Sequence, residues 1–281
     1  MADVKESYHA TAGGWRSFNT GNVIAYGVDD GEAPAGWRTI YSSTFQTDDG
    51  LWNARQETQS NDNSYNHPDN IVHSPGGLRV IGRRENRGGR PYTSGDYTGD
   101  SVVVPNYFRA DVTATLPIEP GMWPAPLWFR PLNSPHGEID VCETWPFDWP
   151  NRGGPDFSVA LHRDYSLSPR QVNSFLKYSM LPNPDPAVPH TYTVIKTQNR
   201  IEFLCDGVRT YCWDGGTPSW NGTLRIGPLP EWYATYFEVP ERIWYPRITL
   251  QVGGSGATEP DPLWQESELV VHNLKIYEQE D

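Results

Sequence analysis

The 281-residue chain has no run of about 18 consecutive apolar residues, the least that a membrane-spanning helix needs. Its beginning, MADVKESYHATAGGW, lacks the apolar segment that a secretory signal peptide carries. No membrane partner is therefore expected. We expect an extracellular protein whose leader has been removed or that leaves its cell by another route. A place in a virus particle is a further alternative.

Basic residues are also scarce. The chain has 22 Lys and Arg against 35 Asp and Glu, which gives a net charge of −13. Nucleic acids and anionic membrane surfaces attract basic proteins, so neither is expected as a partner. Aromatic residues are instead abundant, with 12 Trp and 15 Tyr. Such rings serve either to stack on the faces of sugars or to pack the interior of a Trp-rich β-sandwich.

Only three cysteines occur, and they form no metal-ligand spacing. Two of them, Cys205 and Cys212, flank a predicted hairpin turn at Asp206-Gly207. That turn would place Cys212 opposite Ile201, which at ~3.3 Å per residue is too far from Cys205 for a disulfide bond. We therefore expect these two thiols and that of Cys142 to be free.

Helical periodicity is nearly absent, and only 169–181 predicts a helical turn or two. Short segments of alternating apolar and polar residues between turn residues predict β-strands instead. The 26 Gly and 26 Pro are spread along the chain, which favours one β-sandwich or barrel domain over residues 1–281. Residues 1–30 are expected to be irregular or to extend the first strand. The predicted strands lie within 77–85, 100–117, 124–132, 138–145, 156–166, 190–213 (three strands, with turns at Gln198-Asn199 and Asp206-Gly207), 244–254 and 267–279.

One predicted strand carries much negative charge. The sequence GEIDVCE at 137–143 places Glu138, Asp140 and Glu143 within a few residues. Acidic residues are depleted in strands because their desolvation is costly. The segment is framed on both sides by tryptophans: Trp123, Trp128, Trp145 and Trp149. A solvated run of charge would not have such neighbours, so these carboxylates need another explanation.

The spacing of the three carboxylates fits a bulged strand. In a regular strand Glu143 would point away from Glu138 and Asp140, but one β-bulge near Val141-Cys142 returns it to their face. The two glutamate Cα atoms would then lie ~13 Å apart, and side chains leaning together would bring their carboxyl groups to ~5–6 Å. That separation is typical of a retaining glycosidase. A calcium-binding acidic strand and a partly exposed edge strand are the alternatives.

The segment GEIDVCETW at 137–145 resembles the active-site signature of glycoside hydrolase family 16, in the single-bulge form that laminarinases and agarases share. The resemblance extends over most of the chain. Further similar segments, in the same order, are NHPDNIVHSPGGLRVIGRRE (66–85), GMWPAPLWF (121–129), VALHRDYS (159–166), HTYTVIKTQNRIEFLCDGV (190–208) and ITLQVGG (248–254).

This resemblance implies an all-β fold, a concanavalin-like β-jelly roll sandwich whose concave face forms a groove for a polysaccharide. It implies that Glu138 is the nucleophile, Asp140 its assisting carboxylate and Glu143 the general acid/base. It also places His162 beside them, near the nucleophile; a structural histidine on a strand is the alternative for that residue.

The resemblance further implies that Trp123 and Trp128 line the groove. Trp145 is added as a candidate because it lies two residues after Glu143. The family usually spaces its tryptophan pair by three residues, whereas four residues, 124–127, intervene here. An added residue reverses every later side chain of a strand unless a bulge absorbs it.

Two other positions depart from the family. A basic, sugar-contacting residue often follows a Ser-Gly pair, but the local candidates here are Asp96 in SGD and Asp100 in TGD. The family also often holds a calcium ion between acidic residues near the chain ends, where this sequence has Thr44 and His272. We therefore expect no structural metal and leave the sugar open.

The sequence thus predicts a monomeric, cofactor-free retaining endo-β-glycosidase that hydrolyses a neutral polysaccharide. A β-1,3-glucan or mixed-linkage β-glucan is the leading substrate, and a galactan or another cell-envelope glycan is the alternative. A non-catalytic, lectin-like carbohydrate-binding module on the same fold would need neither Glu138 nor Glu143. Both are present, which favours an enzyme.

Overall fold

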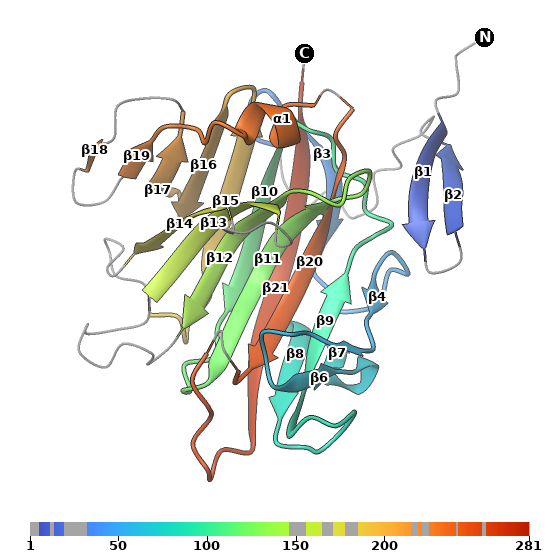
Figure 1. The fold of residues 1–281 in the computed structure, drawn as a ribbon, viewed down its shortest axis with the longest axis vertical. Coiled ribbons are helices and arrows are strands. Elements are labelled where there is room, and N and C mark those ends of the chain that lie inside the picture. Colours follow the sequence, from blue (N-terminus) through green and yellow to red (C-terminus); the bar gives the residue numbers. More distant parts are fainter. Residues whose placement is uncertain are drawn as a thin grey trace.

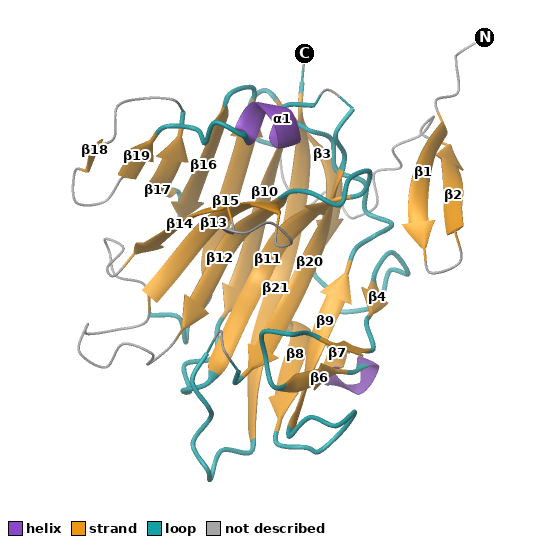
Figure 2. Ribbon diagram, viewed as in Figure 1, coloured by secondary structure: helices purple, strands orange, loops and turns teal. Residues whose placement is uncertain are grey.

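The computed structural model describes residues 6–11, 14–19, 33–145, 156–164, 171–177, 185–214, 219–220, 225–239, 241–254 and 257–280. The predicted all-β fold is confirmed. Within these residues the helical structure is limited to α1 (Tyr233–Phe237) and a 3-10 turn, η1 (Pro68–Asn70). Figure 2 shows both as short purple segments beside the strands. No helix in the described part of the chain is long and apolar enough to cross a membrane.

One sheet is built around the long C-terminal strand β21 (Glu266–Gln279). Strands β8 and β3 pair with its two halves along one edge, and β10 pairs along the other. The sheet then continues through β15, β16 and β17 to the short strands at its end. The strands that build this sheet with β21 are β7 (Ile71–Ser74), β8 (Gly77–Arg83), β3 (Trp37–Ser43), β10 (Phe108–Thr115), β15 (His190–Thr197), β16 (Arg200–Cys205), β17 (Val208–Trp213), β19 (Arg225–Gly227) and β18 (Ser219–Trp220).

The second sheet carries the predicted site. Its strands follow in the spatial order β14, β13, β12, β11, β20, β9, and β4 and β6 pair with the outer edge of β9. The two sheets lie face to face (Figure 1). The strands of this second sheet are β14 (Gln171–Lys177), β13 (Asp156–Asp164), β12 (Glu138–Trp145), β11 (Met122–Pro131), β20 (Trp244–Val252), β9 (Tyr92–Thr98), β4 (Asn53–Ala54), β6 (Ser64–Asn66) and β5 (Glu57–Thr58), which pairs with β6.

The core lies between the sheets and follows from strand alternation. On β10, every second residue from Phe108 to Ala114 is fully buried, and the residues between them are partly exposed. On β12, the side chains of Ile139, Val141 and Cys142 are at most 3% exposed and belong to the same core. Removing this apolar surface from water provides the main driving force for packing the sheets together. The opposite face of β12 is left for the acidic residues.

The structure confirms the predicted three-strand unit at 190–213 as β15, β16 and β17. Its second turn has positive φ angles at Asp206 and Gly207, as a two-residue hairpin turn requires. A register shift after Phe203 places Cys212 opposite Glu202, one position from the predicted partner. None of the three cysteines forms a disulfide bond, as expected, and all three are buried.

The prediction of a helical turn within 169–181 is wrong for its described part. Residues 171–177 form β14, which pairs with β13 along its whole length. Tertiary pairing overrides a weak local preference of this kind. Residues 169–170 and 178–181 lie outside the described residues. Near the chain start, β1 (Glu6–Thr11) and β2 (Gly14–Asn19) pair as a separate two-stranded sheet.

Candidate active site

A β-bulge in β12 sets the geometry of the site. Asp140 pairs with Ala160 of β13, but Glu143 pairs with Ser158, so three steps along β12 match two along β13. The pairing with β11 shifts register at the same place. The extra residue lies within Val141-Cys142, where the carboxylate spacing predicts it. The bulge therefore turns Glu143 back to the face that Glu138 and Asp140 occupy.

Two of the carboxylates meet a histidine from the neighbouring strand. His162 lies opposite Glu138 in the β12–β13 register. Its Nε2 atom is 2.8 Å from Oδ2 of Asp140 and 3.8 Å from Oε1 of Glu138. All three side chains are less than a tenth exposed. The structure thus brings together three residues that the sequence analysis singled out.

A cation on the other neighbouring strand faces the same cluster. The Nε atom of Arg130, on β11, lies 2.6 Å from Oε2 of Glu138. Arg130 is 30% exposed, whereas the Glu138 side chain is 7% exposed. A guanidinium this close stabilises the ionised form of the carboxyl group. Glu138 is therefore held between a cation on one side and Asp140 with His162 on the other.

Glu143 has a different environment. Its Oε1 atom accepts a hydrogen bond of 2.8 Å from the indole Nε1 of Trp123 on β11. Both side chains are partly exposed. Trp123 thus lies at the partly exposed part of this face and orients Glu143 through the hydrogen bond. The prediction that Trp123 lines the groove did not include this contact.

The pKa of each glutamate is raised by burial, and different neighbours oppose the rise. Burial, followed by the charge of Asp140, raises the pKa of Glu138 to about 7, and Arg130 is the largest influence that lowers it. Burial and the charge of Asp140 also raise the pKa of Glu143 well above its usual range, whereas His162 and the Trp123 hydrogen bond oppose them. At neutral pH a pKa of about 7 leaves part of Glu138 ionised, and the raised pKa of Glu143 favours its protonated form. One group can attack as an anion while the other donates a proton.

Three residues of this cluster carry atoms that can ligate a metal ion. Oxygen and nitrogen atoms of Glu138, Asp140 and His162 lie within 4.8 Å of one another. The guanidinium of Arg130 already lies against Glu138, so an added cation there would face like-charge repulsion. This donor set suits acid–base chemistry better than metal binding.

The second tryptophan of the pair is placed by another bulge. Along β11 and β20, Ala125 pairs with Thr249 and Trp128 with Arg247, so one extra residue lies on β11. Trp123 and Trp128 therefore face the same side in spite of their longer spacing. Trp128 is only 8% exposed, and the guanidinium carbon of Arg247 lies 4.1 Å from its ring centroid. This cation covers its ring, whereas Trp123 is partly exposed.

Three candidate positions remain. The side chain of Trp145 is outside the described residues, although its backbone ends β12. Asp96, at the position where a basic residue is common in the family, is fully buried and forms an ion pair with Arg247. The neighbouring strand β20 thus supplies the cation that β9 lacks. Asp100 accepts a hydrogen bond from Asn53 near the surface.

Comparison of the chain with known proteins identifies its fold. No family model and no curated protein sequence matches the chain. Among solved structures, the laminarinase catalytic domain from Thermotoga maritima is 18% identical with a TM-score of 0.68, covering 87% of this chain and 99% of that one. The laminarinase from Rhodothermus marinus is 21% identical with a TM-score of 0.67, covering 87% and 98%.

A third structure is that of a non-specific endo-β-1,3(4)-glucanase described as a member of family GH16, in a mutant form crystallised with an oligosaccharide. It is 20% identical with a TM-score of 0.69, and the match covers 88% of this chain and 96% of that one. The chain has the fold of the family 16 laminarinases. The fold implied by the GEIDVCETW resemblance is thereby confirmed.

Within this laminarinase-like fold, two site residues escaped the sequence analysis. Arg130 and Arg247 are far apart in the sequence, yet both approach the ring of Trp128, with guanidinium carbons 5.6 and 4.1 Å from its centroid. The signal for Arg130 was a single charge in the otherwise apolar sequence MWPAPLWFRP. Its strand position, two residues after Trp128, places it on the face of the acidic cluster.

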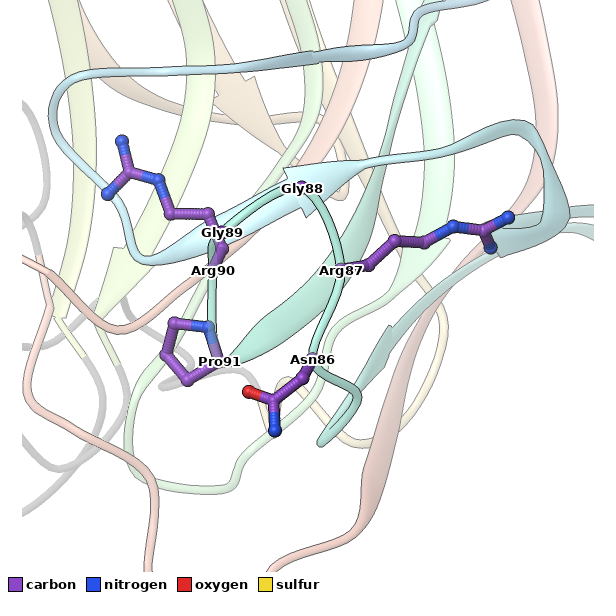
Figure 3. A pocket seen from close by; sticks show the side chains of 6 residues that line it. All are labelled: Asn86, Arg87, Gly88, Gly89, Arg90 and Pro91. Atoms are coloured by element: carbon purple, nitrogen blue, oxygen red, sulfur yellow. The ribbon is translucent and has the colours of Figure 1, made fainter.

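This protein also has a surface hollow that neither Arg130 nor Arg247 lines. It measures about 440 Å³ and is formed by the loop between β8 and β9, residues 86–91. Figure 3 shows Arg87 and Arg90 extending to opposite sides of this loop. The lining contains none of the predicted site residues, so the hollow is not the candidate active site.

Proposed function

We propose that this protein is a retaining endo-hydrolase of a β-glucan with 1,3 or mixed 1,3/1,4 linkages. The observation that carries the proposal is the bulge of β12, which sets Glu138, Asp140 and Glu143 on one face and gives the two glutamates different partners. The solved structures with the same fold are described as laminarinases and endo-β-1,3- or 1,3(4)-glucanases, which supports the substrate class.

In the first step, the Glu138 carboxylate attacks the anomeric carbon and forms a glycosyl ester. The bond to the leaving oxygen breaks, and Glu143 donates its proton to that oxygen. In the second step, Glu143, now ionised, removes a proton from a water molecule. The water oxygen attacks the anomeric carbon and the ester bond to Glu138 breaks, so both groups return to their starting states with net retention.

The neighbouring residues assist these two steps without entering them. Arg130 favours the ionised Glu138 that begins the reaction. Asp140 and His162 hold the other side of the cluster, and the charge of Asp140 helps keep Glu143 protonated. Trp123 fixes the orientation of Glu143 through its indole N–H. All of these contacts depend on the bulge of β12, which places the three carboxylates on one face.

The proposal is tested with purified polysaccharides. Release of reducing ends is measured on β-1,3-glucan, mixed-linkage β-glucan, cellulose and a galactan, for the wild type and for Glu138→Gln and Glu143→Gln. We expect hydrolysis of the first two substrates and its loss in each variant, with unchanged circular dichroism. Near-wild-type turnover in either variant would sink the assignment of that residue.

Stereochemistry gives an independent check. Proton NMR of the first product, recorded before mutarotation, should show the β-anomer from a β-linked substrate. An initial α-anomer would rule out the double displacement. A protein that binds the glucans without cleaving them would instead favour the lectin-like alternative. The expected monomer and the expected secretion remain predictions.

A further inference from the structure

A buried ion pair lies on the same face as the carboxylates, two strands away from them. Arg247 of β20 is opposite Trp128 in the β11–β20 register, and it pairs with Asp96 of β9. The side chains are 8% and 0% exposed. A buried ion pair is seldom more stabilising than apolar side chains of the same volume. Its place beside the candidate active site therefore needs an explanation other than stability.

Asp96 holds one edge of the guanidinium group in a fixed orientation. Arg247 donates to its two carboxylate oxygens from Nε, at 3.2 Å, and from Nη2. The same carboxylate also accepts hydrogen bonds from Gln59 Nε2, at 3.1 Å, and from Thr98 Oγ1, at 3.2 Å. A carboxylate held by this many donors has little freedom to turn. It therefore fixes the guanidinium that it binds.

The third nitrogen of Arg247 remains available. Because Nε and Nη2 form one edge of the planar group, Nη1 lies at the opposite corner and points away from Asp96. Nη1 has no hydrogen-bond partner among the described residues, and it is not one of their unpaired polar atoms that lack contact with solvent. It is thus a charged donor that a ligand can reach.

This donor lies close to the carboxylates. The guanidinium carbon of Arg247 is 4.1 Å from the ring centroid of Trp128, so the group extends from β20 over β11. Trp128 is in turn opposite Asp140 in the β11–β12 register. Neighbouring strands are ~4.8 Å apart, which is about the width of a sugar ring. A sugar unit bound at the carboxylates therefore comes within reach of Nη1.

The charges around Trp128 indicate the kind of group that this donor binds. Arg247 is neutralised by Asp96, and Arg130 lies against Glu138. Asp140 adds a further negative charge beside them. An anionic sugar substituent would be repelled by these carboxylates. A neutral hydroxyl oxygen is therefore the acceptor that suits Nη1.

We propose that Arg247 is a substrate-contact residue whose Nη1 donates a hydrogen bond to a hydroxyl oxygen of the sugar unit over Trp128, and that Asp96 is the positioning residue that orients it. The inference rests on the proposed function and adds a determinant of its specificity. The sugar meets the guanidinium here and not the face of the indole ring. Recognition at this point therefore depends on a particular hydroxyl group, and an analogue without it is rejected.

The contact is tested with a β-1,3-glucan oligosaccharide and its monodeoxy analogues, each lacking one hydroxyl group. Affinity is measured by isothermal titration in the Glu138→Gln background, which stops turnover. We expect at least one analogue to bind about 10- to 100-fold more weakly than the parent sugar, because it leaves a charged donor unpaired. Adding Arg247→Met should weaken the parent sugar by a similar factor and abolish that difference.

Two further variants separate positioning from general damage. Asp96→Asn should reduce the same difference, because the neutral amide no longer holds the guanidinium by its charge, and should leave the ranking of the other analogues unchanged. Arg109→Met is the matched control. Arg109 also pairs with an aspartate, Asp111, and its guanidinium carbon lies 5.9 Å from the ring centroid of Tyr277, but it is in the opposite sheet. This variant should keep both the affinity and the difference.

Arg247→Met leaves Asp96 buried without its partner, which can unfold the protein. The double variant Asp96→Leu/Arg247→Met removes both charges and should give the same binding pattern in a folded protein. A difference between parent and analogue that persists in either Arg247 variant would overturn the contact. So would equal affinity for the parent sugar and every analogue in Glu138→Gln alone. An Asp96→Asn variant with an unaltered difference would overturn the positioning role.

These outcomes are distinct from failure of the proposed function. A wild type that hydrolyses β-glucans while Arg247→Met leaves the analogue difference intact refutes the contact and keeps the function. A protein that binds the oligosaccharide through Arg247 but releases no reducing ends keeps the contact and refutes the hydrolase. Absence of binding and hydrolysis together would overturn both.

Discussion

Replacing Arg130 by Leu should move the acid limb of the pH–activity profile upward. The guanidinium Nε lies 2.6 Å from Glu138, and it is the largest influence that opposes the rise of the Glu138 pKa to about 7. Leu keeps an apolar stem of similar shape but removes the charge. As the proposed nucleophile, Glu138 must be ionised to attack, so a higher pKa for Glu138 means less active enzyme at acidic pH.

The size of the shift follows from the geometry. Two unit charges whose centres lie ~4 Å apart interact by about 4 kcal/mol at an effective dielectric constant of ~20. Arg130 is 30% exposed, so solvent screens part of that energy. A remainder of ~1.5–3 kcal/mol corresponds to a shift of roughly one to two pKa units. At pH 6, kcat/KM should therefore fall by about 10- to 100-fold.

The assay is kcat/KM against pH from about 4.5 to 9 on a soluble β-1,3-glucan oligosaccharide, a range that includes the Glu138 pKa of about 7. Arg130→Lys keeps a positive charge and should restore most of the acid limb. Arg109→Leu is the matched control, because Arg109 forms a similar ion pair with Asp111 on β10, in the opposite sheet. An acid limb in Arg130→Leu that coincides with the wild type would refute the claim that this guanidinium sets the ionisation of Glu138.

Three further outcomes are expected. Trp123→Ala should weaken oligosaccharide binding, measured by isothermal titration, by roughly 1–3 kcal/mol, the scale of one lost aromatic platform. Trp128→Ala should weaken binding by less, because Arg247 covers the Trp128 ring. Equal losses would contradict this ranking. Because the pKa of Glu138 rises from 4.5 to about 7 on folding, the folded state binds more protons between these pH values, and its stability falls as the pH rises through them. Glu138→Gln should flatten this slope in thermal melts recorded at several pH values. An unchanged slope would count against the pKa shift. Melting with EDTA and then with excess calcium should show no change, since His272 bonds to Thr115 and to the carbonyl of Gly76; a drop of several degrees that calcium reverses would reveal a calcium site.

The strands and the bulge of β12 could be predicted because both leave a mark on the sequence. Alternation indicated β10 and the three strands at 190–213, and the offset of Glu143 from Glu138 and Asp140 required one extra residue. The position of β14 could not be predicted, because 171–177 has weak alternation and its strand depends on pairing with β13.

The partners of the carboxylates were harder to predict than the carboxylates themselves. Arg130 is a single charge in an apolar strand, and only its register beside Glu138 shows its purpose. Asp96 is paired with Arg247, which lies 151 residues away in the sequence. Long-range contacts of single polar residues leave no periodic signal.

The bulge between Ala125 and Trp128 has a consequence for how this fold tolerates changes in chain length. One extra residue on β11 is accommodated next to β12 without turning Trp123 or Trp128 to the wrong side. A single-residue deletion at Pro126 would restore a regular ladder, whereas the same deletion within β10, which alternates regularly, would exchange its core and solvent faces. A bulged strand such as β11 can thus gain or lose a residue at its bulge during evolution, while a regularly alternating strand such as β10 must change by substitution alone.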